Sequence, residues 1–259
     1  MTRFFLPRLP RLFAHRGDNV CWPENTLPAF RAAADLGIEY LELDVWLSRD
    51  GRIVVHHDMD TRWTCGRRAC IPETAFYRLR ELDPGCGFVD ACGERPFADR
   101  GIRIPALEEV LDELPGMLFT VEIKQDSERL RELLLGLLDE KQALDRVLVA
   151  SHQDSVVQRV REMAPEVPTN FGYREARELI LRVEKGDLSG YVPPGSALQI
   201  PPVREGRTLV TPGVIRAAHE LGVEVHVWTV NDPDDARKLL HMGVDGIMSD
   251  DARMLACLF

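Results

Sequence analysis

Asn25-Thr-Leu-Pro-Ala-Phe-Arg-Ala-Ala-Ala-Asp-Leu-Gly-Ile-Glu-Tyr-Leu-Glu-Leu-Asp-Val45 joins a helical pattern to a strand pattern in one short stretch. Apolar residues recur at helical spacing as far as Leu36, and Gly37 stands where a glycine commonly ends a helix. The run that follows is mostly apolar and has the length of a strand. The stretch therefore predicts a helix over 25–36 and a buried strand over 39–45.

The same alternation continues along the chain. Helical patterns cover 25–36, 106–114, 127–140, 154–163, 174–184, 211–221 and 232–241. Strand patterns cover 12–15, 39–45, 118–124, 147–151, 168–172, 197–201, 223–230 and 246–249. Strands that alternate with helices form a parallel sheet, and eight of them predict a closed TIM-like (β/α)8 barrel. A chain of 259 residues with 45% apolar content suits one such domain over 1–259.

One strand pattern, 52–57, does not fit the alternation. Only Leu47-Ser-Arg-Asp-Gly51 separates it from the strand before, whereas a parallel crossover needs about a dozen residues. We therefore expect a β-hairpin extension after the second strand, with Asp44 and His57 at the same level. Residues 60–104 are irregular and hold four of the six cysteines, so we expect an inserted subdomain or lid there. Free thiols are favoured over a disulfide or a zinc site.

Two of the predicted strands each carry a carboxylate together with a second charged residue two positions further along. Glu42 and Asp44 are two residues apart and share a face of their strand, as do Glu122 and Lys124. Inward carboxylates repel one another unless a cation lies between them. Three of them suit a hard cation such as Mg²⁺ or Ca²⁺, while Lys124 could hold a phosphate oxygen. A solvated strand end and an internal Glu–Lys ion pair are the alternatives.

Two histidines could complete such a site. His15 ends the first strand beside Arg16, and His57 follows the hairpin. Next to a cation, one imidazole could accept the proton of a nucleophile and the other could protonate a departing alkoxide. A hydrogen-bonded core histidine is the alternative for each. Trp228 could form an apolar wall of the site or simply pack in the core, and His152 could touch a substrate.

Charge limits the partners that we expect. The formal net charge is −10, which repels nucleic acids and anionic lipids at long range. A small phosphodiester could still bind if a cation bridges it to acidic side chains. The N-terminal residues do not resemble a signal peptide, and no apolar run is long enough to span a bilayer. We expect a cytoplasmic protein without a transmembrane segment, and the sequence does not predict its oligomeric state.

Eight short blocks occur in one order along nearly the whole chain. They are Phe13-Ala-His-Arg-Gly17, Pro23-Glu-Asn-Thr26, Glu42-Leu-Asp-Val45, Val54-Val-His-His-Asp58, Ile104-Pro-Ala-Leu-Glu108, Glu122-Ile-Lys124, Trp228-Thr-Val-Asn231 and Gly246-Ile-Met-Ser-Asp250. Each block is weak by itself. Together they resemble the glycerophosphodiester phosphodiesterase family.

The resemblance implies a TIM-like barrel with an insertion after the His-Asp motif. It also implies hydrolysis of glycerophosphodiesters to sn-glycerol 3-phosphate and an alcohol, with one divalent metal ion (Mg²⁺, Ca²⁺ or Mn²⁺). Matched position by position, it assigns the catalytic residues His15 and His57, the metal ligands Glu42, Asp44 and Glu122, and the substrate-binding residues Arg16, Lys124 and Trp228.

The chain departs from the family pattern in two places. Met59-Asp-Thr-Arg-Trp-Thr64 and Ser151-His152 both differ from the residues that the family often has there. Both lie where the leaving alcohol would bind, so they bear on the substrate. A lysophospholipase D that acts on lysophospholipids at the same site is one alternative. A catalytically silent phosphodiester-binding protein is another, although such a protein would be expected to have lost one of the site residues.

Overall fold

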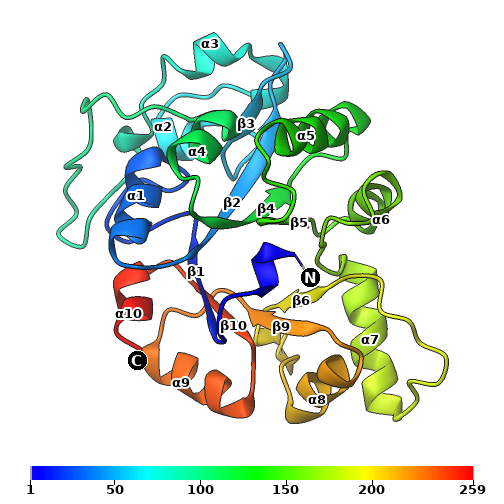
Figure 1. Cartoon of the computed structure of the whole chain (residues 1–259). Helices are drawn as coiled ribbons and strands as arrows, with labels where there is room; N and C mark the ends of the chain where they lie inside the picture. Colours follow the sequence, from blue (N-terminus) through cyan, green and yellow to red (C-terminus); the bar gives the residue numbers. More distant parts are fainter. Residues whose placement is uncertain (1, 259) are drawn as a thin grey trace.

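The sheet of the protein is parallel and curls round on itself (Figure 1). The computed structural model describes residues 2–258. The strands follow the order β5–β4–β2–β1–β10–β9–β6. Their bounds are β1 (Arg11–His15), β2 (Tyr40–Leu47), β4 (Leu118–Ile123), β5 (Val147–Ala150), β6 (Ala197–Ile200), β9 (Glu224–Val227) and β10 (Gly246–Ser249). This is the predicted TIM-like architecture with one modification, at the seam between β5 and β6.

The prediction of a full strand over 168–172 is wrong. That segment makes two single parallel bridges, Val149 to Thr169 and Asn170 to Ala197. Pro168 has no N–H to donate, and α7 begins at Tyr173, so the segment has little length left for a regular ladder. Backbone hydrogen bonds nevertheless tie it to β5 on one side and to residues 196–197 on the other. A very short extended segment therefore closes the barrel.

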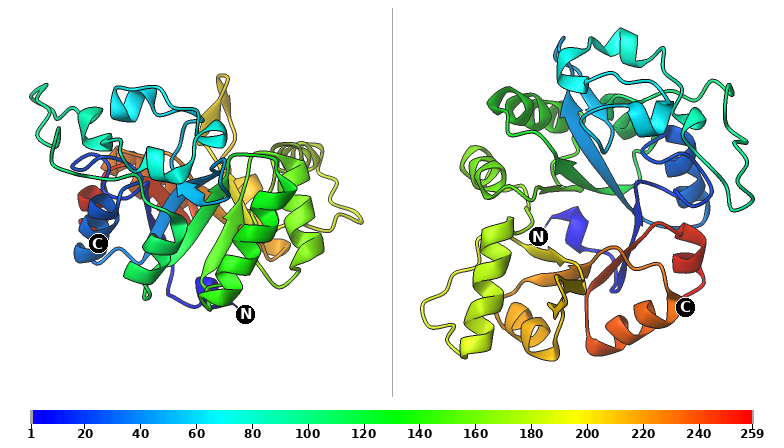
Figure 2. Two further views of the ribbon diagram at one scale, coloured as in Figure 1. Left: turned by 90° about the horizontal axis from the view of Figure 1, so that it is seen from above. Right: turned by 180° about the vertical axis from the view of Figure 1, so that it is seen from behind.

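Helices cover the outside of the sheet (Figures 1 and 2). The predicted helices are confirmed with ends shifted by at most two residues. They are α1 (Leu27–Asp35), α4 (Leu107–Glu113), α5 (Glu128–Glu140), α6 (Asp154–Met163), α7 (Tyr173–Lys185), α8 (Pro212–Glu220) and α9 (Pro233–Met242). A short helix that was not predicted, α10 (Ala252–Ala256), follows the last strand. No helix within residues 2–258 has the length and apolar character needed to cross a bilayer.

Side chains of the N-terminal segment fill the amino end of the barrel interior. The short 3-10 helix η1 (Arg3–Phe5) places the fully buried Phe4 against Phe13 and Tyr40, with ring centroids 6.3 and 5.2 Å apart. Figure 1 shows this N-terminal segment inside the ring of strands. The interior is therefore a packed core at its amino end, and any site must lie towards the carboxyl end.

The predicted hairpin is confirmed. β3 (Ile53–Val55) runs antiparallel to β2, with Val45 opposite Val55, and the turn contains Gly51 at φ +84°. The register differs by one residue from the prediction, because the His56 N–H donates to the Asp44 carbonyl at 3.0 Å. His57 thus lies one residue further along than the level of Asp44.

Residues 60–104 form the expected insertion. It consists of short helices around a small apolar cluster that also includes Val54 and Trp46 of the β2–β3 hairpin, and its cysteines are free thiols, as are the other two. The helices are α2 (Arg62–Cys65), η2 (Ile71–Glu73), α3 (Phe76–Leu79) and η3 (Pro84–Cys86). The left view of Figure 2 shows the insertion at the end of the barrel opposite the N-terminus.

Candidate active site

Three carboxylates meet at the carboxyl end of the barrel. The register of β2 and β4 sets Asp44 directly beside Glu122, and the register of β1 and β2 sets His15 beside Glu42. One oxygen from each of Glu42, Asp44 and Glu122 lies within 4.8 Å of the others. Glu42 and Asp44 are buried. Parallel strands that end at the same level have therefore gathered acidic groups from distant parts of the chain.

Two cations lie among these carboxylates. Lys124 Nζ is 2.9 Å from Asp44 Oδ1 and 3.0 Å from Glu122 Oε2. Arg16 Nε is 3.3 Å from Asp44 Oδ2, and the same guanidinium also reaches Glu24 at 3.2 Å. Asn25 donates to Asp44 Oδ2 at 2.8 Å. Asp44 is thus well compensated, whereas Glu42 has neither cation within ion-pair distance among the described residues.

This unequal compensation separates the two buried acids on β2. Burial, together with the charge of Asp44, raises the pKa of Glu42 to about 8. Burial also opposes ionisation of Asp44, but Lys124 and Arg16 outweigh it and lower the pKa of Asp44 to about 2. Glu42 therefore ionises readily only when additional positive charge is present. The three carboxylates fit a hard divalent cation, which prefers oxygen ligands.

His15 is held by a carboxylate that the sequence analysis did not assign to the site. Its Nδ1 lies 2.7 Å from Asp250 Oδ1, and its Nε2 lies 3.7 Å from Glu42 Oε2. Asp250 also accepts hydrogen bonds from Asn19 and Asn231, both at 2.7 Å. Burial lowers the pKa of His15, but Glu42 and Asp250 raise it by more. Asp250 fixes the ring so that Nε2 faces the carboxylates. Its signal in the sequence is a carboxylate directly after a strand, in Gly246-Ile-Met-Ser-Asp250.

His57 approaches from the hairpin side. Its Nδ1 is 2.8 Å from Asp58 Oδ1, and its side chain is about one-third exposed. The neighbouring His56 is buried, and its ring nitrogens lie 2.8 Å from the Asp58 carbonyl and from Thr64 Oγ1, so it has a structural role. His226 is fully buried, and its ring nitrogens lie near Glu224 and Gln199.

One cavity of about 120 Å³ connects these groups. Of the residues predicted for the site, all except Asp44 line it: His15, Arg16, Glu42, His57, Glu122, Lys124 and Trp228. Asp44 is fully buried and forms ion pairs with both cations. His152 also lines the cavity, with its Nε2 3.5 Å from Glu122 Oε1 and its ring 5.3 Å from Trp228. The geometry brings the predicted residues together, while their individual roles stay predictions.

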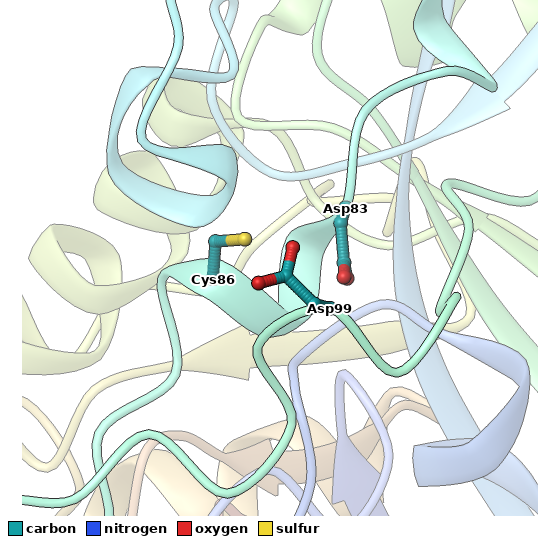
Figure 3. Close-up of side chains that lie close together, drawn as sticks. All are labelled: Asp83, Cys86 and Asp99. Carbon is teal, nitrogen blue, oxygen red and sulfur yellow. The ribbon is translucent and has the colours of Figure 1, made fainter.

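A second group of possible metal ligands lies in the insertion. Figure 3 shows Asp83, Cys86 and Asp99 converging around η3. Asp83 already accepts a hydrogen bond from Gly85 N–H at 2.8 Å as the cap of this short helix. Asp99 is exposed, and no histidine belongs to the group. The arrangement is explained by the local turn and lacks the acid–base groups of the barrel site.

Comparisons with known proteins give a consistent result. A family model described as "Glycerophosphoryl diester phosphodiesterase family" matches residues 15–254. A glycerophosphodiester phosphodiesterase of Caldanaerobacter subterraneus subsp. tengcongensis is 30% identical, and the match covers 94% of this chain and 95% of that protein. The crystal structure of a glycerophosphodiester phosphodiesterase of Agrobacterium tumefaciens has a TM-score of 0.77 at 25% identity, covering 96% of this chain and 99% of that one. An Oleispira antarctica phosphodiesterase, solved in complex with the product sn-glycerol-3-phosphate, shares the fold with a TM-score of 0.78 at 24% identity, covering 96% of each chain.

Proposed function

The chain belongs to the glycerophosphoryl diester phosphodiesterase family, and on this premise we propose that it hydrolyses glycerophosphodiesters to sn-glycerol 3-phosphate and an alcohol with the help of one divalent cation. The observation that carries the proposal is the cavity lined by two oriented histidines, two cations, and two of the three carboxylates that lie close together. Phosphodiester cleavage needs acid–base groups on both sides of the phosphorus and positive charge at the phosphoryl oxygens.

Glu42, Asp44 and Glu122 are the residues that would hold the cation. Bound there, Mg²⁺, Ca²⁺ or Mn²⁺ would supply positive charge and Lewis acidity at the phosphoryl oxygens. Lys124 and Arg16 lie beside the same carboxylates and line the cavity, which supports a role for both in binding the remaining phosphoryl oxygens. The half-buried Trp228 supplies an apolar wall for the carbon atoms of the substrate.

The two histidines divide the proton transfers. Asp250 binds His15 Nδ1 and Asp58 binds His57 Nδ1, so each ring directs Nε2 away from its own carboxylate partner. One Nε2 would accept the proton of the attacking hydroxyl, and the other would protonate the departing alkoxide. The attacking hydroxyl is either water or the glycerol 2-hydroxyl, which would give a cyclic phosphate first.

A second candidate is a lysophospholipase D that uses the same residues. The observation that favours it is an apolar groove beside Trp228, whose floor includes Phe171, Ile180 and Ile200. A silent phosphodiester-binding protein is the third candidate, and the complete set of predicted site residues argues against it. We also propose a cytoplasmic location, which the free thiols support because reducing compartments preserve them.

The decisive experiment measures release of sn-glycerol 3-phosphate from glycerophosphocholine and release of choline from lysophosphatidylcholine. Glycerophosphocholine and lysophosphatidylcholine are incubated with the purified chain and Mg²⁺, Ca²⁺ or Mn²⁺, or with EDTA. We expect metal-dependent turnover of glycerophosphocholine that His15→Ala and Glu122→Gln abolish, while the control variant Asp99→Asn retains it. Full activity in His15→Ala would refute the proposal. Faster headgroup release from lysophosphatidylcholine would favour the lysophospholipase D.

A further inference from the structure

A second cavity adjoins the catalytic one on the side of α7. It has a volume of about 170 Å³ and lies between α7 and a small hairpin, β7 (Val203–Arg204) with β8 (Arg207–Thr208). The two cavities share His152, Gln199 and Trp228 in their walls. A phosphodiester carries two substituents on phosphorus. One that extends past Trp228 enters this second cavity, which we call the α7 groove.

The floor of the α7 groove is apolar. Phe171, Ile180 and Ile200 are buried there, and Leu209 is half-buried. Such a surface packs against the carbon skeleton of a substituent.

The rim of the α7 groove is cationic. Arg177 projects from α7, and Arg204 and Arg207 come from the hairpin, whereas Glu205 is the one carboxylate that lines the groove among the described residues. This is notable in a chain of net charge −10. The cavity on the opposite side of the site has the reverse balance, with Glu24 and Asp58 against Arg16.

The arginines differ in how far they are already neutralised. Arg177 has no ion-pair partner within residues 2–258. Arg204 lies over the ring of Tyr173 at 4.6 Å, and its nearest carboxylate, that of Glu205, is 3.8 Å away and highly exposed. Arg207 is paired with Glu184, which does not line the groove. Two guanidinium groups therefore retain most of their capacity to bind an anion, and guanidinium forms paired hydrogen bonds with phosphate.

We propose that the α7 groove binds a second phosphate on the substrate, so that the preferred substrates are glycerophosphodiesters with two phosphates, such as bis(glycerophosphoryl)glycerol. The first phosphate lies at the catalytic cavity, the linking carbon atoms lie on the apolar floor, and the second phosphate meets Arg177 and Arg204. This inference rests on the proposed function and names the substrate class. An acyl chain would also fit the floor, but it would leave Arg177 and Arg204 without an anionic partner.

Steady-state kinetics on two soluble substrates test the proposal. The value of kcat/KM is measured for glycerophosphoglycerol, with one phosphate, and for bis(glycerophosphoryl)glycerol, with two. We expect the wild type to prefer the second substrate by about tenfold, mainly through KM, because a charge-assisted bidentate contact contributes on this scale. Arg177→Gln and Arg204→Gln should each reduce this ratio severalfold. Arg174→Gln, on the same helix but outside the groove, should leave the ratio unchanged.

Each other outcome overturns the inference in a recognisable way. Normal turnover of glycerophosphoglycerol without a preference for two phosphates would refute the α7 groove assignment and leave the proposed function intact. A preference for lysophosphatidylcholine that the arginine variants do not change would assign the groove to an acyl chain. Loss of sedimentation with phosphatidylglycerol vesicles in these variants, without a change in the soluble ratio, would assign the arginines to a membrane surface. No turnover of either diester would refute both proposals.

Discussion

The barrel interior holds a buried charge cluster at each end, and the two clusters are compensated in different ways. At the amino end, Arg11 makes two hydrogen bonds of 2.6 Å to the two oxygens of Glu224 and a third of 2.6 Å to the Tyr40 hydroxyl. Its remaining donors reach the carbonyls of Pro7 and Phe5. Every N–H donor of this guanidinium has an acceptor, so the cluster offers no free donor to a ligand.

At the carboxyl end, positive side chains compensate the buried carboxylates only in part. Two acids on β2 and one on β4 share Lys124 and Arg16, and Glu42 receives little of this compensation. The pKa values express the contrast: that of Glu42 is raised to about 8, chiefly by burial, whereas at the amino end Arg11 outweighs burial and lowers that of Glu224 to about 2. A saturated cluster stabilises the fold, while an unsaturated one is available to a ligand.

The largest expected effect is a loss of activity when the charge cluster at the carboxyl end is changed. Glu122→Gln should lower kcat/KM about a thousandfold or more, because Glu122 is a proposed ligand of the divalent cation that would stabilise charge on the phosphate. The free energy of unfolding should change little, because relief of repulsion among three carboxylates offsets the loss of the ion pair between Glu122 and Lys124. Parallel kinetics and urea denaturation measure both quantities, with Asp99→Asn as the control. Normal kcat/KM in Glu122→Gln would contradict the assignment of Glu122 to the active site.

Arg11→Met should have the opposite profile. Removing Arg11 leaves Glu224 and the Tyr40 hydroxyl without their partner, which costs about 3 kcal/mol of stability for a buried pair. The kcat per folded molecule should stay close to the wild-type value, because the cluster lies at the far end of the barrel. Arg8→Met, at an exposed position, serves as the control. A stable Arg11→Met protein with low kcat would show that the two ends are coupled.

Asp250→Asn should lower kcat about a hundredfold with little change in KM, because Asp250 orients His15 without touching the substrate. A structural role alone would not move the pH profile. Since Asp250 raises the pKa of His15, its replacement should shift the limb of the kcat profile that reports His15 to lower pH. Asn19→Ala removes a hydrogen bond to Asp250 and one to the His15 carbonyl but keeps the contact between Asp250 and the His15 ring, so it should have a smaller effect. An unshifted profile would contradict the positioning role.

The proximity of the site residues could be predicted, because it follows from the common direction of the strands. In a closed parallel barrel the carboxyl ends of all strands lie at one end, so Glu42, Asp44 and Glu122 could be expected near one another once their two strands were recognised. The hairpin that carries His57 followed from the shortness of the link to β2. Its exact register did not, because turn geometry decides one-residue offsets.

Other features depend on contacts between distant positions. Asp250 is a single carboxylate after a strand, and its partner His15 becomes its neighbour only when β10 pairs with β1. The seam at 168–172 has the composition of a strand, but Pro168 and the start of α7 leave room for single bridges alone. The α7 groove is formed by α7, the β7–β8 hairpin and Trp228. Its arginines converge only through the tertiary arrangement of these elements, which the sequence does not reveal.

The smallest expected effect compares the pH dependence of the two ends. For Glu42 the folded pKa of about 8 exceeds that of an unfolded glutamate, so ionisation disfavours the fold and the metal-free protein should lose stability as the pH rises towards 8. Cation binding needs this carboxylate ionised, so the affinity for Mg²⁺ or Ca²⁺ should increase over the same range by up to about tenfold per pH unit. Calorimetric titration about one unit below and one unit above this pKa measures it.

Glu224 should behave in the opposite sense. Its pKa is lowered to about 2, so it contributes stability above the pKa of an unfolded glutamate and loses that contribution as the pH falls towards 2. Acid unfolding of Glu224→Gln should therefore show a weaker pH dependence below about 4.5 than the wild type, while Glu42→Gln should flatten the alkaline side instead. If both variants changed the same limb, the two clusters would not be independent, and the division of the barrel into a saturated end and a ligand-binding end would fail.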